Sequence, residues 1–177
     1  MRIAVVYFSG TGTTAALAGA AAEGAEATLH RIQGSDIIEG RYRATAALEA
    51  IDAAPAVIFG SPTYMGGPAA EFKAFADASS DRWSVQGWAG KLAAGLTSGG
   101  YPNGDQGATL GYFQVLAAQH GMLWCGLDAV GVEEGVNRFG CQAGATAVGK
   151  VGVPDPADLE TARALGCRIA SLAARLG

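Results

Sequence analysis

The feature that most constrains the fold is the regular alternation of apolar runs with stretches of helical periodicity. The apolar runs, of which the second is the weakest, predict strands over residues 2–8, 27–32, 56–59, 91–96 and 122–127. Helical spacing predicts helices over residues 13–25, 42–52, 69–78, 108–119 and 158–176. Continuous apolar strands are typical of a sheet that is covered on both faces. Five strands alternating with helices therefore predict an α/β fold, a doubly wound parallel sheet with helices on both faces.

Length and charge exclude several classes of protein. A chain of 177 residues predicts one domain, spanning residues 1–177. The chain carries 12 basic and 16 acidic residues, for a net charge of −4, whereas a nucleic-acid-binding protein needs a basic surface. No signal region precedes the first strand and no apolar run is long enough to span a bilayer. We therefore expect a cytoplasmic protein without membrane insertion.

The cysteines give no sign of a metal site or a disulfide framework. Cys125, Cys141 and Cys167 are odd in number and widely separated, and they form no CxxC pair. Only two histidines accompany them. We expect thiols in a reducing cytoplasm and no bound metal.

Three loops rich in small residues carry the strongest functional signal. They lie at residues 9–14, 60–67 and 97–107, each directly after a predicted strand. In doubly wound sheets, ligands bind beyond the carboxyl ends of the strands. The three loops should therefore meet at one edge of the sheet. The glycine-rich span 128–153 shows little periodicity and is expected to be loop, with room for one further short element.

The first loop indicates an anion site without a lysine or arginine. It consists of Ser9, Gly10, Thr11, Gly12, Thr13 and Thr14. A triphosphate loop would need a lysine. A dinucleotide turn is a second alternative, because Gly10, Gly12 and Ala15 match GxGxxG/A; the second strand ends without an acid, although Arg31 could meet a 2′-phosphate. We favour a terminal phosphate monoester, held by hydroxyl and backbone N–H groups at a helix N-terminus, since a plain helix cap needs only one hydroxyl.

The other two loops indicate what carries the phosphate. The second loop offers an aromatic ring and a thioether among glycines that allow close backbone approach: Pro62, Thr63, Tyr64, Met65 and Gly66. The third adds a flexible, hydroxyl-bearing wall: Ser98, Gly99, Gly100 and Tyr101. An isoalloxazine ring needs apolar groups over its faces and backbone amides along its polar edge. A phosphate loop with two such ring loops fits flavin mononucleotide (FMN) better than a dinucleotide.

The chain also resembles a known family. The segments "FSGTGTT", "GSPTYMGGPAAEFKAFAD", "WSVQGWAGKLAAGLTSGG", "QHGMLWCGL" and "DLETARALGCRIASLA" occur in the order found in flavodoxin-like NAD(P)H:quinone oxidoreductases of the tryptophan repressor-binding-protein type. This resemblance covers most of the chain. It implies a flavodoxin-like sheet with strand order 2-1-3-4-5. It also implies FMN, with its phosphate on residues 9–14 and its ring on the second and third loops.

The resemblance assigns further residues to the site. Trp83 stands where the family has a tryptophan that lines the substrate and nicotinamide site, although it could equally serve packing. The family often has two histidines before "GM", the first near the flavin; here Gln119 and His120 hold those positions. Gln119 is therefore a candidate cofactor-binding residue. His120 has two interpretations, a helix C-cap or a contact in the active site.

The resulting functional prediction is an FMN-dependent oxidoreductase. It would take hydride from NADH or NADPH and pass electrons to a quinone or a similar planar acceptor. The flavin would supply the chemistry, and no catalytic side chain is evident. Three alternatives remain: a one-electron flavodoxin carrier, a flavin reductase that uses FMN as a diffusible substrate, and a flavin-binding module without turnover. The resemblance implies a homo-oligomer, dimer or tetramer, although residues 34–55 are shorter here than the corresponding family region.

Overall fold

The computed structural model describes residues 2–130, 135–149 and 152–176. A parallel central sheet has the strand order β2-β1-β5-β7, and both β8 and β9 pair with β7. Its parallel strands are β1 (Ala4–Tyr7), β2 (Thr28–Arg31), β5 (Ala56–Tyr64), β7 (Leu92–Gly99), β8 (Leu123–Trp124) and β9 (Ala145–Val148). Short antiparallel pairings add β6 (Gly67–Pro68) to β5 and join β3 (Ile37–Ile38) to β4 (Arg41–Tyr42).

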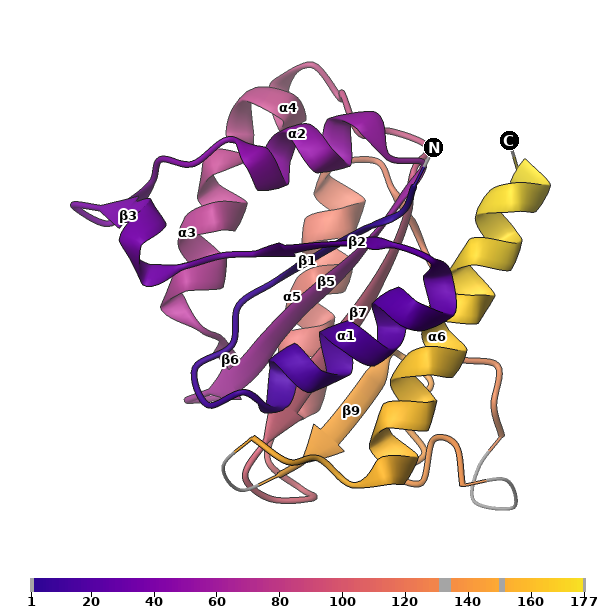
Figure 1. Cartoon of the computed structure of the whole chain (residues 1–177). Helices are drawn as coiled ribbons and strands as arrows, with labels where there is room; N and C mark the ends of the chain where they lie inside the picture. Colours follow the sequence, from indigo (N-terminus) through magenta and orange to yellow (C-terminus); the bar gives the residue numbers. More distant parts are fainter. Residues whose placement is uncertain (1, 131–134, 150–151, 177) are drawn as a thin grey trace.

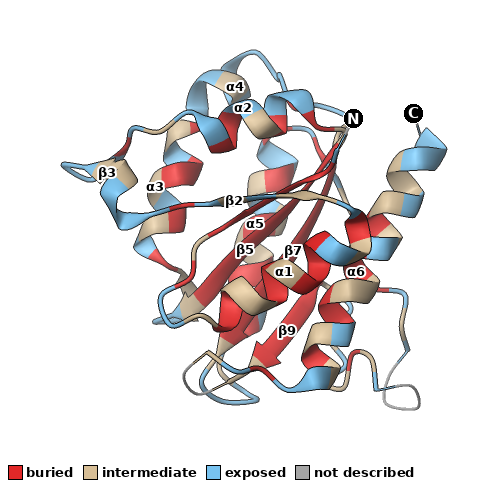
Figure 2. Cartoon of the chain, viewed as in Figure 1, coloured by how far each residue is buried: buried red, intermediate tan, exposed pale blue. Residues whose placement is uncertain are grey.

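Helices cover both faces of this sheet, as Figure 1 shows. They are α1 (Thr13–Ala25), α2 (Ala46–Ala53), α3 (Ala70–Ala78), α4 (Ser80–Ser84), α5 (Gln106–Gln119) and α6 (Pro156–Leu176), with a 3₁₀ turn at Gly34–Asp36. α1 and α6 pack on one face, while α2, α3 and α5 pack on the other. Between these layers, β1 is fully buried and β5, β7 and β9 are buried along most of their lengths, whereas the edge strand β2 is partly exposed (Figure 2).

The continuous apolar strands have a simple cause in this layered arrangement. Successive side chains of a strand point to opposite faces of the sheet. Along β1, Val5 joins the core under α1 and α6, while Ala4 and Val6 join the core under α2, α3 and α5. Because both faces are covered, every position of β1 needs an apolar side chain.

The predicted fold class and the order 2-1-3-4-5 are confirmed, with one change at the last position. The strand expected over 122–127 is only Leu123–Trp124, which pairs with the start of β7. After Cys125 the chain leaves β7, and the Leu127 N–H donates to the Gln142 carbonyl at 2.8 Å. β9 then pairs with the end of β7. The further short element expected within 128–153 is thus β9, and residues 131–134 and 150–151 of that span lie outside the described residues.

The prediction of a helix over residues 42–52 was wrong about where the helix starts. α2 begins at Ala46, and Tyr42 belongs to β4 instead. The Tyr42 ring packs edge-on against Phe75 with centroids 5.7 Å apart, and Tyr42 pairs with Ile37. Tertiary packing of the ring thus outweighs the local helical spacing.

Pro68 belongs to a short strand and not to the helix that follows it. It lies in β6, where it pairs with Thr63, and α3 begins two residues later. The Ala69 N–H donates to Ser61 Oγ at 2.9 Å, which fixes the approach to α3. Consequently β5 runs through Tyr64, so most of the span 60–67 expected to be loop is strand. β7 likewise runs through Gly99.

Within the described part of the chain, no helix combines the length and apolar character needed to cross a bilayer. The same residues contain no group of three or more His, Cys, Asp or Glu side chains that could hold a metal ion. Cys125 is buried, Cys141 is half-buried, and Cys167 is exposed on α6; all three are free thiols.

Candidate functional site

The three predicted loops meet at the carboxyl edge of the sheet, as expected. The hydroxyl groups of Thr14 and Ser98 are 2.8 Å apart, which links the first loop to the end of β7. The Tyr64 ring lies over Gly10, where a Cβ atom would collide with the Tyr64 hydroxyl. The first loop therefore contacts both of the others, and Gly10 has no room for a side chain in this arrangement.

The first loop is held by the side chain of Ser9. Ser9 is 2% exposed, and its Oγ accepts hydrogen bonds from the N–H groups of Gly12 and Ala15, both at 3.2 Å. This hydroxyl thus caps the first turn of α1. Gly12, at φ +102°, makes the turn into the helix in a conformation that favours glycine.

Two further hydroxyl groups of this loop are engaged within the protein. Thr13 Oγ1 accepts from the Gly152 N–H at 3.2 Å, and Thr14 bonds to Ser98. Gly10 and Thr11 are exposed, and the first turn of α1 contains no acidic residue. An anion at this helix N-terminus would therefore meet Thr11, backbone N–H groups and the positive end of the helix dipole, with no carboxylate in that turn to repel it.

The second loop divides into an inward and an outward part. Pro62 is buried, and the Thr63 hydroxyl is 2.9 Å from that of Thr97 and 2.8 Å from that of Thr109. Tyr64 is 46% exposed, and Met65, at φ +49°, is fully exposed. Gly66 follows at φ +77°. The tyrosine ring and the thioether are thus the groups that this loop presents at the surface.

The third loop is supported by a residue that the sequence did not identify. Gln106, at the start of α5, is buried, and its Nε2 donates to the carbonyls of Tyr101 at 3.4 Å and Ala147 at 3.1 Å. Gly99 accepts at its carbonyl from the Gly149 N–H at 3.3 Å. Tyr101 is 70% exposed, and Gly100 beside it is exposed as well.

A fourth segment borders the site without having been predicted. Gly149 contacts the third loop and Gly152 contacts the first, through the hydrogen bonds to Gly99 and Thr13. This segment follows β9 and lacks periodicity, so the only signal available in the sequence was its glycine content. Arg31, at the end of β2, also reaches the first loop: its Nη2 donates to the Ser9 carbonyl at 3.0 Å.

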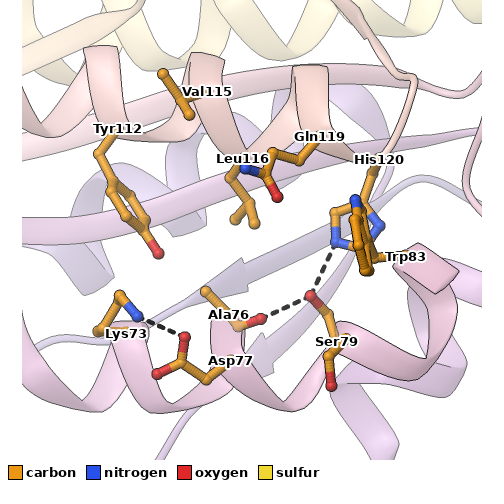
Figure 3. A pocket seen from close by; sticks show the side chains of 11 residues that line it. Lys73, Ala76, Asp77, Ser79, Trp83, Tyr112, Val115, Leu116, Gln119 and His120 are labelled. Atoms are coloured by element: carbon orange, nitrogen blue, oxygen red, sulfur yellow. Dashed lines mark hydrogen bonds and ion pairs between the residues drawn. The ribbon is translucent and has the colours of Figure 1, made fainter.

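Trp83 and Gln119 do not lie with the three loops within one chain. They line a separate cavity of about 330 Å³ between α3, α4 and the end of α5, shown in Figure 3. The other lining residues are Lys73, Ala76, Asp77, Ser79, Ser80, Tyr112, Val115, Leu116 and His120. α5 has 14 residues and is about 21 Å long. Since α5 begins beside the third loop, Gln119 lies at its far end.

His120 is a buried residue in the wall of this cavity. It is 1% exposed, and its ring packs against that of Trp88 with centroids 4.3 Å apart and a tilt of 34°. Its Nε2 is 2.8 Å from Ser79 Oγ (Figure 3). Ser79 donates its own proton to the Ala76 carbonyl at 2.7 Å, so it accepts from the imidazole Nε2–H. Nδ1 is then a buried acceptor without a partner among the described residues. Burial lowers the pKa of His120, which favours the neutral ring.

α4, which carries Trp83, is fixed by polar contacts on both sides. Arg82 forms an ion pair with Asp52 at 3.0 Å, and Asp52 also accepts from the Trp88 indole N–H at 2.6 Å. Gln86 Nε2 donates to the carbonyls of Trp83 at 3.0 Å and Gln119 at 3.1 Å. The Trp83 ring nevertheless remains 48% exposed, so it is available to a further group.

Comparison with known proteins gives a consistent result. The family model described as NADPH-dependent FMN reductase matches residues 1–136. A relative from Pseudomonas aeruginosa named flavodoxin FldP is 36% identical, with coverage of 99% of this chain and 98% of that protein. An NAD(P)H dehydrogenase (quinone) from Archaeoglobus fulgidus is 33% identical, and this match also covers 99% of this chain and 98% of that protein. The crystal structure of a WrbA-like flavodoxin from Agrobacterium tumefaciens is 43% identical, covers 99% of both chains and superimposes with a TM-score of 0.81.

Proposed function

The chain belongs to the NADPH-dependent FMN reductase family, and from this premise we propose that it is an FMN-dependent oxidoreductase. It takes hydride from NADH or NADPH and passes electrons to a quinone or a similar planar acceptor. The names of relatives that match nearly its whole length support this activity, since several are NAD(P)H dehydrogenases (quinone). The observation that carries the proposal is the meeting of three loops at one sheet edge through Thr14, Ser98, Tyr64 and Gly10.

The residues at this edge fit a flavin with a terminal phosphate. The first turn of α1 has no acidic side chain, and Gly10 and Thr11 are exposed beside its N-terminus. The loop, residues 9–14, would hold the phosphate through the Thr11 hydroxyl and backbone N–H groups, while Ser9, Thr13 and Thr14 keep the loop in shape.

The second and third loops would hold the ring. Tyr64, Met65 and Tyr101 are exposed at their tips and offer apolar surface. Pro62 and Thr63 fix the backbone behind them, and Gly66, Ser98, Gly99 and Gly100 complete these two walls. When bound, FMN supplies hydride and electron transfer. The role of the protein is then to orient the ring and keep one face open, with no side chain acting as acid or base.

A one-electron carrier is the second candidate function. The observation that favours it is the 36% identity, over nearly the whole chain, to a protein named flavodoxin. A flavin reductase with FMN as a diffusible substrate would use the same three loops. The one-electron carrier, the flavin reductase and the proposed quinone oxidoreductase would all bind FMN, and they differ in the electron transfer that follows binding.

The separation of Trp83 from the three loops has a consequence for the oligomeric state of the protein. If Trp83 and Gln119 serve a flavin, that flavin belongs to a second copy of the chain, because α5 separates the two regions. We therefore propose a homo-oligomer, a dimer or tetramer, in which the exposed Trp83 ring faces a neighbouring cofactor site. The three free thiols are typical of a reducing compartment, which supports a cytoplasmic location.

The test is an absorption titration of the purified protein with FMN, followed by anaerobic addition of NADH or NADPH. The proposal predicts that the flavin band shifts on binding, is bleached in one stage by at least one nicotinamide, and returns when a quinone is added. A band that is bleached by neither nicotinamide, but does respond to a one-electron donor, would favour the carrier. Failure of the protein to perturb the FMN spectrum at all would contradict both functions.

A further inference from the structure

The first loop lacks a positive charge of its own, yet it would face a phosphate dianion. Residues 9–14 contain no lysine or arginine. Of their four hydroxyl groups, those of Ser9, Thr13 and Thr14 are engaged by protein atoms. The helix dipole contributes only about half a charge at this terminus. The donors that remain are therefore few for an anion of this charge.

The register of the sheet brings one cation to this loop. Arg31 is the last residue of β2 and pairs with Tyr7 of β1, so it stands beside the point where β1 passes into the loop. The Ile32 N–H donates to the Tyr7 carbonyl at 2.7 Å, which holds the end of β2 against β1. The guanidinium Nη2 then donates to the Ser9 carbonyl at 3.0 Å.

Ser9 connects this guanidinium to the first turn of α1. Its carbonyl accepts from Arg31, while its hydroxyl accepts from the N–H groups of Gly12 and Ala15. A guanidinium has five N–H donors, and among the described residues only the Ser9 carbonyl accepts from that of Arg31. None of the ion pairs among the described residues includes Arg31. Its charge is therefore not neutralised by a carboxylate in the described part of the chain.

We propose that Arg31 is the cation of the phosphate site, selecting flavins that carry a 5′-phosphate over those that do not. This rests on the proposed function, since it assumes that the phosphate of FMN binds at the first loop. The residue acts in two ways. Its bond to the Ser9 carbonyl fixes the loop backbone. Its positive charge attracts the phosphate dianion, and solvent and salt screen this attraction only in part.

The experiment compares the affinities of FMN and riboflavin, which differ only in the phosphate. Dissociation constants are measured by quenching of flavin fluorescence for the unaltered protein, Arg31→Gln and Arg31→Lys. The control is Arg41→Gln, which removes the same charge from an exposed position of β4. Arg31→Gln should weaken FMN about three- to thirty-fold at about 50 mM salt and leave riboflavin within about twofold. The loss should shrink at about 500 mM salt, and Arg31→Lys should retain most of the FMN affinity.

Several outcomes overturn the proposal. If Arg31→Gln weakens FMN and riboflavin equally, the residue only shapes the loop. If FMN affinity is unchanged but the preference between NADPH and NADH shifts, Arg31 recognises the nicotinamide cofactor and not the flavin phosphate. If Arg41→Gln has the same effect as Arg31→Gln, the charge acts without regard to position. By contrast, failure of the unaltered protein to bind either flavin would contradict the proposed function itself.

Discussion

The hydroxyl groups of Thr14 and Ser98 form a buried hydrogen bond of 2.8 Å between residues 84 positions apart in the chain. Thr14 lies in the first turn of α1, and Ser98 lies near the end of β7. The two loops at the carboxyl edge are thus fixed relative to each other by side chains as well as by the sheet.

Removing one partner of this bond should destabilise the protein. Thr14→Val keeps the shape of the side chain but leaves the Ser98 hydroxyl buried without its partner. We expect the free energy of unfolding to fall by about 1–3 kcal/mol, measured by urea denaturation. The double variant with Ser98→Ala should lose less than the sum of the two single changes. Ser171→Ala, at an exposed serine within α6, is the control and should not lower stability, because alanine is the better helix former.

A negative charge at Thr13 should oppose binding of the phosphate. Thr13→Glu introduces a carboxylate into the first turn of α1, and we expect FMN affinity to fall on the order of a hundredfold. Thr13→Gln has nearly the same size without the charge, and it serves as the matched control for the lost bond from Gly152. Fluorescence titrations with FMN and riboflavin check this. If Thr13→Glu and Thr13→Gln lose FMN affinity equally, the phosphate does not lie near Thr13.

Stability should depend on pH through His120. Burial lowers the pKa of His120, whereas the unfolded chain has a histidine pKa of about 6.5. Between the two pKa values the unfolded state binds more protons, so the free energy of unfolding rises with pH. The stability is therefore complete above about pH 6.5 and is lost as the pH falls toward the lowered pKa, by at most about 1.4 kcal/mol per pH unit.

The two histidines of the chain can be separated by mutation. Burial also lowers the pKa of His30, so the measurement starts from a His30→Gln variant. Urea denaturation between about pH 5 and 8 should show a slope in this variant that is absent after the further change His120→Asn. Identical slopes in the two variants would mean that His120 does not carry the dependence.

Trp83 should affect turnover and not FMN affinity. Trp83 is 48% exposed and lines a cavity separate from the three loops, so Trp83→Ala should remove only the surface that we propose to face a second substrate or a second copy. We expect kcat/KM with a quinone to fall about two- to tenfold. Trp88→Phe is the contrasting variant, because the buried Trp88 bonds Asp52 and should instead lower stability. Subunit mass is measured for each variant, and loss of flavin binding in Trp83→Ala would support a packing role.

The ion pair at the start of α6 should support the segment beside the first loop. Asp158 is 1% exposed, bonds Arg138 Nε at 2.7 Å and accepts from the Val148 N–H at 3.2 Å. Asp158→Asn should lower the free energy of unfolding by about 2–4 kcal/mol. FMN affinity should fall as well, because Val148 leads directly to Gly149. Asp155→Asn, whose carboxylate is exposed and 3.8 Å from Arg138, should leave both measurements nearly unchanged.

The sequence by itself determined the layered architecture and the edge at which the loops meet. α1 has the bounds that its sequence predicted, 13–25, because the glycine turn before it and its alanine content are local signals. The continuous apolar strands required a sheet covered on both faces. Once the strands are parallel, loops that follow them must lie together. These conclusions depend only on patterns within a few residues or on topology.

Tertiary structure alone decided the contacts between residues that are far apart in the sequence. Tyr42 lies outside its expected helix because its packing on Phe75 outweighs local propensity, and most of the expected loop 60–67 is strand because Thr63 pairs with Pro68. The last sheet position is shared by β8 and β9, which are separated by 20 residues (125–144) that no local pattern predicts to return. Trp83 and Gln119 lie apart from the loops because the length of α5 lies between them, and Arg31 meets Ser9 only through the register of β2 on β1. Such distances depend on how elements pack, and spacing along the sequence does not encode them.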